Sequence, residues 1–226
     1  MEKHDQENRR QAARFGPGPI GGQMSAIVGG LLLRFRLSAL SERHDSGIVL
    51  AVFSFVNGCL SIGLMAMAAL ITGQPFVFPS LGPTAFLFFY TPLTPAASPR
   101  NAIIGHLIGA LAGWGSLIVF GLQDVGPALS TGVSGPRVAA AALSLGLTSG
   151  LMVLLKAPHP PAGATTLIIS LGLLRTFDQL LVLMAAVLLL TLQAIVINRL
   201  AGLPYPLWSP PAPASAPGSS PARRNQ

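Results

Sequence analysis

Four long apolar runs dominate the pattern of hydrophobic and polar positions along the chain. At 1.5 Å per residue in a helix, each run spans about the 30 Å of hydrocarbon in a bilayer, the third only just. The sequence therefore predicts four membrane-spanning helices, at residues 48–72, 102–122, 138–155 and 179–200.

Two shorter apolar stretches, 76–90 and 159–173, each begin with an interruption by proline and glycine. Residues 79–84 read PSLGPT and residues 160–165 read PPAGAT, so the pattern Pro-x-x-Gly-x-Thr occurs twice, each time before an apolar run. Proline and glycine interrupt regular structure, so a repeated interruption in so hydrophobic a chain indicates a purpose. We predict two half-helices, each reached by an extended arm.

The positive charges test whether these short stretches cross the membrane, because cytoplasmic loops collect Lys and Arg. If both stretches re-enter, four crossings result, and Arg100, Lys156 and Arg175 all lie outside. If both cross, six crossings result, and of these three only Arg175 lies outside, together with Arg137. Six crossings fit better and place both termini in the cytoplasm. The cytoplasmic charges are then Arg34, Arg36, Arg43, Arg100, Lys156 and Arg199.

The order of long helix, interrupted half-helix and long helix then occurs twice, at 47–122 and 137–200. Three crossings per unit is an odd number, so the second unit is inverted relative to the first. We expect an all-α membrane protein with two structurally related three-segment halves, arranged as inverted repeats. Their half-helices approach the bilayer midplane from opposite sides.

Composition supports the membrane assignment. Of 226 residues, 51% are hydrophobic and only 9% charged, and the mean hydropathy is +0.62, whereas a soluble domain has roughly 25% charged residues. The net charge is +7, and the basic residues lie mainly in the first 43 residues and at segment ends, where they meet anionic headgroups. Membrane lipid is therefore the expected partner, rather than nucleic acid. The single cysteine, Cys59, excludes an intramolecular disulfide and is expected to be a small buried hydrophobe.

The two ends of the chain differ from the rest. Residues 1–23 are expected to be a disordered basic tail, and 209–226, rich in Pro, Ala and Ser, a second disordered tail. For residues 24–46 the sequence predicts an amphipathic helix on the cytoplasmic surface, followed by a linker. Residues 47–208 are then the transmembrane domain. The N-terminus has the pattern of neither a secretory signal nor a transit peptide. We expect the protein in the inner membrane of a bacterium.

The paired interruptions suit a small anion. A half-helix that begins inside the bilayer has up to four unpaired N–H groups and about half a positive charge at its N-terminus, and such broken backbone needs a partner in hydrocarbon. Glycine allows close approach, proline fits a first helical turn, and hydroxyls add donors. The alternative is a pair of proline-kinked helices with packing glycines. The predicted binding residues are Ser80, Gly82, Pro83, Thr84, His159, Pro160, Pro161, Gly163, Ala164 and Thr165.

Further polar residues at membrane depth are candidates for the pathway or for coupling. His106 and His159 could couple a proton to the anion, although a hydrogen bond to a neighbouring helix is the favoured interpretation of His106. Asn57 lines the pathway or bonds between helices, and Lys156 draws anions or anchors at the interface. No metal site is expected, because there are four histidines, no His-Glu-x-x-His and no cysteine cluster.

Glycines at every fourth position favour close helix packing. They form one row at 105, 109 and 113 and a second, shorter row at 146 and 150. The partner helix belongs to the same chain or to another subunit, so a homo-oligomer through these faces is one interpretation.

Three stretches resemble the HPP family of integral membrane proteins, which is named for its His-Pro-Pro motif. They are APHPPAGATTL, PSLGPTAFLFFYTPLTPAASPRNAIIGHLIGALAG and LPYPLWS, with His159, Pro160 and Pro161 as the tripeptide. The resemblance covers about residues 35–208 and implies transport, because some members from photosynthetic lineages are linked to nitrite movement across membranes. The family is usually described with four spanning helices. Some members also carry a cytoplasmic regulatory domain, and regulation through such a domain is not carried over to this chain.

We therefore expect a transporter or channel for a small inorganic anion, without a cofactor or catalytic residue. The residues indicate only a small anion, and the choice of nitrite over nitrate, formate or chloride rests on the resemblance. The alternative is a non-transporting membrane scaffold or regulatory subunit. A membrane enzyme is disfavoured, because Asp and Glu are almost absent from the spans and no nucleophile–base pair stands out.

Overall fold

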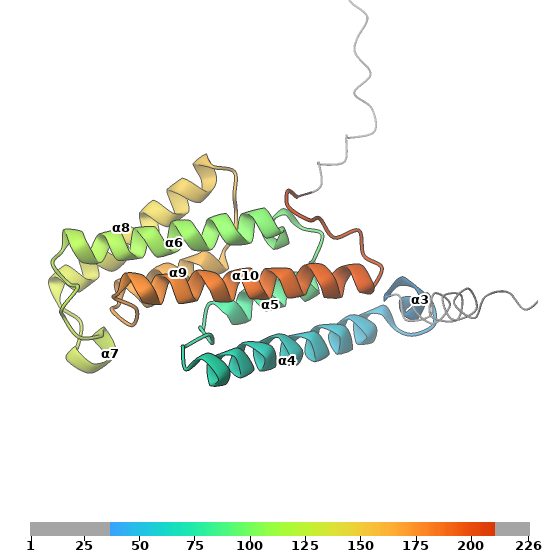
Figure 1. The fold of residues 1–226 in the computed structure, drawn as a ribbon. Helices are drawn as coiled ribbons and strands as arrows, with labels where there is room; N and C mark the ends of the chain where they lie inside the picture. The colour runs from blue at the N-terminus through green and yellow to red at the C-terminus, as the bar shows by residue number, and fades with distance from the viewer. Residues whose placement is uncertain (1–36, 211–226) are drawn as a thin grey trace, which may run out of the picture.

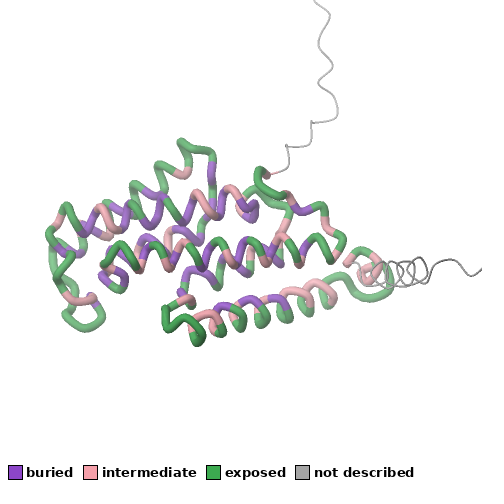
Figure 2. Tube along the Cα trace, in the orientation of Figure 1, coloured by how far each residue is buried: buried purple, intermediate pink, exposed green. Residues whose placement is uncertain are grey.

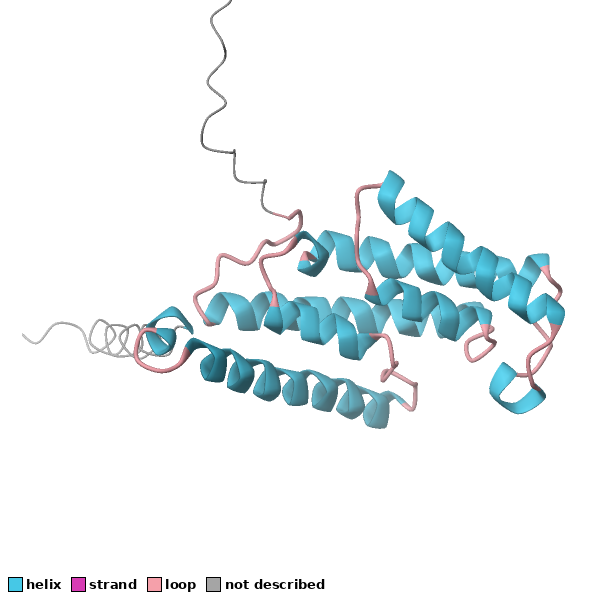
Figure 3. Ribbon diagram, turned by 180° about the vertical axis from the view of Figure 1, so that it is seen from behind, coloured by secondary structure: helices cyan, strands magenta, loops and turns pink. Residues whose placement is uncertain are grey.

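The computed structural model describes residues 37–210, which form helices joined by loops without a strand in that range (Figures 1 and 3). Both predicted tails lie wholly or almost wholly outside the described residues, as does most of the predicted interfacial helix. The helices are α3 (Leu37–Ser41), α4 (Ser46–Thr72), α5 (Leu81–Tyr90), α6 (Pro99–Val119), α7 (Ala128–Thr131), α8 (Gly135–Leu154), α9 (Pro161–Ser170) and α10 (Phe177–Leu200), with a 3₁₀ turn, η1 (Pro95–Ala97).

The four predicted spans correspond to α4, α6, α8 and α10, which are long and apolar enough to cross a membrane. α6 and α8 each begin three residues earlier than predicted, and the first turn of both contains a Pro-Arg pair. Proline fits the first turn of a helix, and Ser98 caps α6 by accepting from the Asn101 amide. Arg100 and Arg137 are accommodated in these helices because each side chain donates hydrogen bonds to backbone carbonyls.

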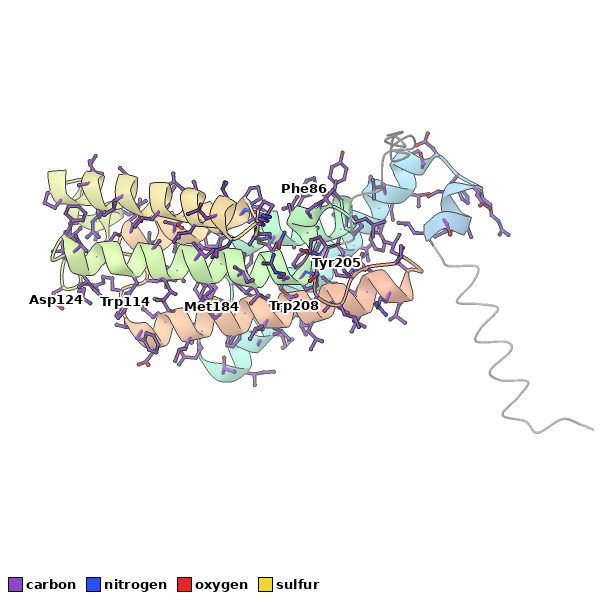
Figure 4. The ribbon with its side chains drawn as sticks, turned by 90° about the horizontal axis from the view of Figure 1, so that it is seen from above. Phe86, Trp114, Asp124, Met184, Tyr205 and Trp208 are labelled. Carbon is purple, nitrogen blue, oxygen red and sulfur yellow. The ribbon has the colours of Figure 1, made fainter. Side chains whose placement is uncertain are left out.

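The two short helices, α5 and α9, end at opposite ends of the bundle. The Asn198 side chain, near the end of α10, donates to the carbonyl of Phe88 at the end of α5. At the other end, Arg137 at the start of α8 donates to the carbonyl of Ser170 at the end of α9. Figure 4 shows the length that separates these ends, with Asp124 at one of them and Tyr205 and Trp208 far from it. The two half-helices, α5 and α9, therefore point in opposite directions along the bundle.

α6 occupies the centre of the bundle, in contact with α8, α9 and α10, whereas α4 lies at the edge (Figure 1). Buried residues line the inner faces of the central helices, and α4 is mostly exposed (Figure 2). Large apolar side chains cover the outside of the bundle, as expected where the solvent is hydrocarbon rather than water. Cys59 lies on this exposed surface, so the prediction that it is buried was wrong.

The two glycine rows differ in whether another helix packs closely against them. A Cβ added at Gly109 would lie 2.6 Å from the carbonyl oxygen of Ala162, and one at Gly113 would lie 2.9 Å from that of Thr166. The first row therefore packs α6 directly onto α9 of the same chain. By contrast, a Cβ added at Gly146 or Gly150 would have no atom within 4 Å beyond its chain neighbours and the nearby backbone of its own helix. The predicted close packing of the second row is therefore absent from the described residues, and that row borders an open apolar groove of about 440 Å³ along α8.

Candidate functional site

The two Pro-x-x-Gly-x-Thr elements meet at a histidine of the central helix. Oγ1 of Thr84, near the start of α5, lies 2.9 Å from Nε2 of His106, and Oγ1 of Thr165, near the start of α9, lies 2.7 Å from Nδ1 of the same ring. All three side chains are wholly buried. His106 therefore bridges two threonines that the sequence places 81 positions apart.

A second histidine completes the site. His159, just before α9, has Nε2 3.2 Å from Oγ1 of Thr84 and 3.3 Å from Nε2 of His106, and the two imidazole rings meet edge to face. Its Nδ1 lies 2.7 Å from the carbonyl oxygen of Ala96 in η1. We refer to Thr84, His106, His159 and Thr165 as the histidine–threonine cluster.

The glycine row explains why α9 can come so close. Gly105 directly precedes His106, and a Cβ there would lie 2.8 Å from Cβ of His159, closer than two carbons can approach. Glycine at this position therefore lets the His-Pro-Pro segment lie against α6, which brings the two imidazoles into contact. At 1.5 Å per residue, His106 lies about 10 Å along α6 from its first residue.

The hydrogen bonds define one arrangement of hydrogens in the neutral cluster. The Ala96 carbonyl can only accept, so Nδ1 of His159 carries the hydrogen and Nε2 is an acceptor. Nε2 of His106 then carries the hydrogen that separates the two facing nitrogens, and Nδ1 of His106 accepts from the Thr165 hydroxyl. The tautomers are inferred from these partners. Every ring nitrogen is then satisfied without a net charge.

The backbone donors expected at the half-helix N-termini are largely paired in this conformation. The amide of Leu81 donates to the Phe78 carbonyl, that of Ala162 to the His159 carbonyl, and that of Gly163 to the Pro160 carbonyl. Pro83, Pro160 and Pro161 have no N–H to offer. The expectation of free amides is therefore wrong for the amides of Leu81, Ala162 and Gly163, and the donors that converge in the cluster are side chains.

The structure separates the predicted binding residues into two groups. Thr84, His159 and Thr165 are brought together, and Ser80 lies one turn from Thr84 with its wholly buried hydroxyl unpaired. Gly82 and Pro83 are exposed instead, and a Cβ added at Gly163 would contact Leu145 of α8 rather than the cluster. In the second element, Pro160 is exposed, Pro161 is buried, and Ala164 is partly buried.

Two other candidates lie away from the cluster. The Asn57 side chain donates to the carbonyl of Phe53 in its own helix and borders an apolar cavity beside α3. Lys156 is exposed at the end of α8, where its carbonyl and that of Leu155 accept from Arg100. Sequence reasoning missed this role of Arg100, a cation that caps the C-terminus of a neighbouring helix.

The cluster is closed in this conformation, because all four of its side chains are wholly buried. Three apolar cavities of the described region lie along α8, beside α3 and α4, and between α4 and α10, and no cluster residue lines any of them. Within residues 37–210, no group of three or more His, Cys, Asp or Glu side chains could hold a metal ion. A bound ligand would therefore have to exchange with hydrogen bonds that the cluster makes to itself.

Known proteins are similar to the chain in sequence. Two proteins of Dictyostelium discoideum, each named as a transmembrane protein, are similar to the chain: one is 33% identical over 134 residues, or 57% of this chain and 44% of the relative. The other is 34% identical over 113 residues, or 47% of this chain and 33% of the relative. The chain thus matches less than half the length of either relative.

No solved structure matches the chain. The family described as "HPP, transmembrane region" matches residues 43–206, which include all four cluster residues. The chain is therefore an integral membrane protein that belongs to the HPP family.

Proposed function

We propose that this protein moves a small inorganic anion, most simply nitrite, across the membrane, and that the anion binds at the histidine–threonine cluster. The observation that carries the proposal is the convergence of Thr84 and Thr165, one from each repeated element, on a single buried histidine. Hydroxyl and imidazole N–H groups are the donors that a small anion requires. Nitrite in particular is suggested by the family alone.

The electrostatics around the cluster favour negative charge. α5 and α9 both begin beside the cluster, so the positive ends of two helix dipoles meet there. The acidic residues of the described range are all exposed, and none lies in α5, α6, α8 or α9: Glu42, Asp45, Asp124 and Asp178. An anion at the cluster would therefore meet no carboxylate.

We further propose that the two halves form inverted repeats with six crossings. Exchanging α4 with α8, α5 with α9 and α6 with α10 converts the observed helix contacts into one another. The α4–α5 contact corresponds to α8–α9, α6–α9 to α10–α5, and α6–α8 to α10–α4, while α6–α10 and α5–α9 correspond to themselves. This correspondence, and the opposite directions of the half-helices, support the proposal.

Because the cluster is closed, transport requires α5 and α9 to separate. The anion would replace the hydrogen bonds that join Thr84 and Thr165 to His106, and movement of one half against the other would give alternating access. No catalytic step or cofactor is needed for this cycle.

Nitrite uptake into proteoliposomes tests the proposal, with chloride, nitrate and formate as competitors. We expect saturable uptake that the double variant Thr84→Val/Thr165→Val abolishes. Thr191→Val is the matched control, because Thr191 is a buried threonine of α10 that bonds only its own helix at the Val187 carbonyl. Equal loss in the control would point to a packing effect.

The alternative is a membrane scaffold without transport. It is favoured by the closed cluster and by the open groove at Gly146 and Gly150, which a second copy of the chain could occupy. If folded protein moves none of these anions, and cluster variants alter only stability, the scaffold becomes the better proposal.

A further inference from the structure

The neutral cluster has no charge to offset that of an anion. In the arrangement of hydrogens described above, each imidazole carries one hydrogen, and both rings are wholly buried. Bringing a monovalent anion into such a site would place an unpaired charge deep in the bundle, which is costly. The dipoles of α5 and α9 lower this cost, and a full positive charge beside the anion at the moment of binding would lower it further.

The surrounding elements supply no free cation inside the bundle, because the Lys156 side chain is exposed at the end of α8. Arg100 of α6 is held by the carbonyls of Leu155 and Lys156 at the end of α8, and Arg137 is held at the opposite end of the bundle. α5, η1 and α9 carry no acidic or basic side chain. Tyr205 is a further titratable group on this side of the bundle, and its ring packs on Phe88 while its hydroxyl donates to the Ala97 carbonyl.

A proton from solvent can supply the charge, and the geometry selects where it binds. Nδ1 of His159 already donates to Ala96, and a hydrogen on its Nε2 would face the hydrogen of His106 across 3.3 Å. Nδ1 of His106 is different, because its partner is the hydroxyl of Thr165 at 2.7 Å. A hydroxyl can rotate from donating to accepting.

We propose that His106 takes up one proton at Nδ1 with each anion, so that the substrate is a monovalent anion carried together with a proton and without net charge. The proposal rests on the proposed function and names its coupling ion. Protonation makes the Thr165 hydroxyl an acceptor from His106. The hydrogen of that hydroxyl is thereby released, and it becomes a donor to the anion. Charge and hydrogen-bond donor are created in one step.

Proton uptake by the purified protein tests this directly. Nitrite is added to detergent-solubilised wild-type protein in weakly buffered solution at about pH 7.5, and the pH change is compared with the amount of nitrite bound. We expect about one proton taken up per anion, and binding without proton uptake would overturn the inference. His106→Gln should bind nitrite more weakly and without proton uptake, whereas Thr191→Val should behave as wild type. Stoichiometric Zn²⁺ binding that His106→Gln abolishes would also overturn it, because the facing nitrogens would then be metal ligands.

A transport measurement separates this inference from the proposed function. Nitrite uptake into proteoliposomes is recorded with a membrane potential of either sign and with an inwardly directed proton gradient, and protein-free vesicles correct for diffusion of the neutral acid. We expect uptake that the proton gradient accelerates and that the potential leaves unchanged. Uptake driven by an inside-positive potential alone would overturn proton coupling and leave anion transport standing. No uptake under any of these conditions would overturn both.

Discussion

α5 and α9 begin with the same Pro-x-x-Gly-x-Thr pattern, yet the protein holds them very differently. α9 lies in a slot formed by the glycine row of α6, and the hydroxyl of its Thr166 is 2.7 Å from that of Thr148 on α8. α5 has no such slot. It packs against α4 and α10, where Asn198 donates to the carbonyl of Phe88.

The difference indicates which half moves. α4, the neighbour of α5, exposes most of its surface, whereas α6, the neighbour of α9, is the most buried of the long helices. A tightly packed helix moves together with its neighbours, whereas a helix with few contacts separates from its neighbours at a lower cost in free energy. We expect α9 to remain fixed on α6 while α4 and α5 shift to open the cluster.

Filling the slot under α9 should have the largest effect. In Gly109→Leu the new side chain would meet the Ala162 carbonyl, which is backbone and cannot move aside. We expect a loss of stability beyond the roughly 1–3 kcal/mol of ordinary overpacking, with little folded protein recovered. The fraction of monodisperse protein and its melting temperature measure this.

Gly146→Leu is the matched control, since it lies in a long helix with open space around it. Equal destabilisation by the two leucines would contradict the slot as the reason for the tight packing of α9.

Loosening α5 should have an intermediate effect. Asn198→Leu removes the donor to the Phe88 carbonyl and leaves that buried acceptor without this partner. We expect a loss of about 1–3 kcal/mol of unfolding free energy, and faster hydrogen exchange in α5 than in α9. Hydrogen exchange read by mass spectrometry checks both helices in one experiment. If the two helices lose protection equally, the first half is not the looser one.

Tyr205 anchors η1, the connection by which the chain leaves α5 for α6. Its buried hydroxyl donates to the Ala97 carbonyl, and burial raises the pKa of this phenol. Tyr205→Phe should cost about 1 kcal/mol at neutral pH. The contribution of the neutral phenol is complete below the ordinary pKa of about 10 and is lost as pH rises above it.

The melting temperatures of wild type and Tyr205→Phe should therefore converge above about pH 10. Tyr90→Phe, at an exposed tyrosine, should show no such convergence. A constant difference between wild type and Tyr205→Phe at all pH values would contradict the assignment.

The smallest effect is expected for the hydroxyl pair that joins α9 to α8. Thr148→Val keeps the shape of the side chain, and Thr166 retains its bond to the Ala162 carbonyl. We expect a loss of about 0.5–1.5 kcal/mol. Thr72→Val, at an exposed threonine that bonds its own helix, is the control. A larger cost than for Asn198→Leu would reverse the comparison between the two halves.

The sequence alone determined the long helices and the starting points of the two short ones. Hydrocarbon selects continuous apolar segments, and proline with glycine marks the interruptions, so both features are local. Thr84 and Thr165 were predicted as site residues for the same reason, because the repeated motif carries them, and His159 was predicted because it directly precedes the second motif. The inverted arrangement of the halves stays a prediction.

Only the tertiary structure decided which residues meet. His106 bonds Thr84 and Thr165 at separations of 22 and 59 positions, and no local pattern distinguishes it from a histidine that merely links two helices. The two glycine rows look alike in sequence, yet one receives α9 and the other faces open space. Likewise, Gly163 turned toward α8 although its motif predicted a ligand contact. Packing between distant segments is set by the whole bundle at once, because a side chain's partners depend on the path of every helix around it.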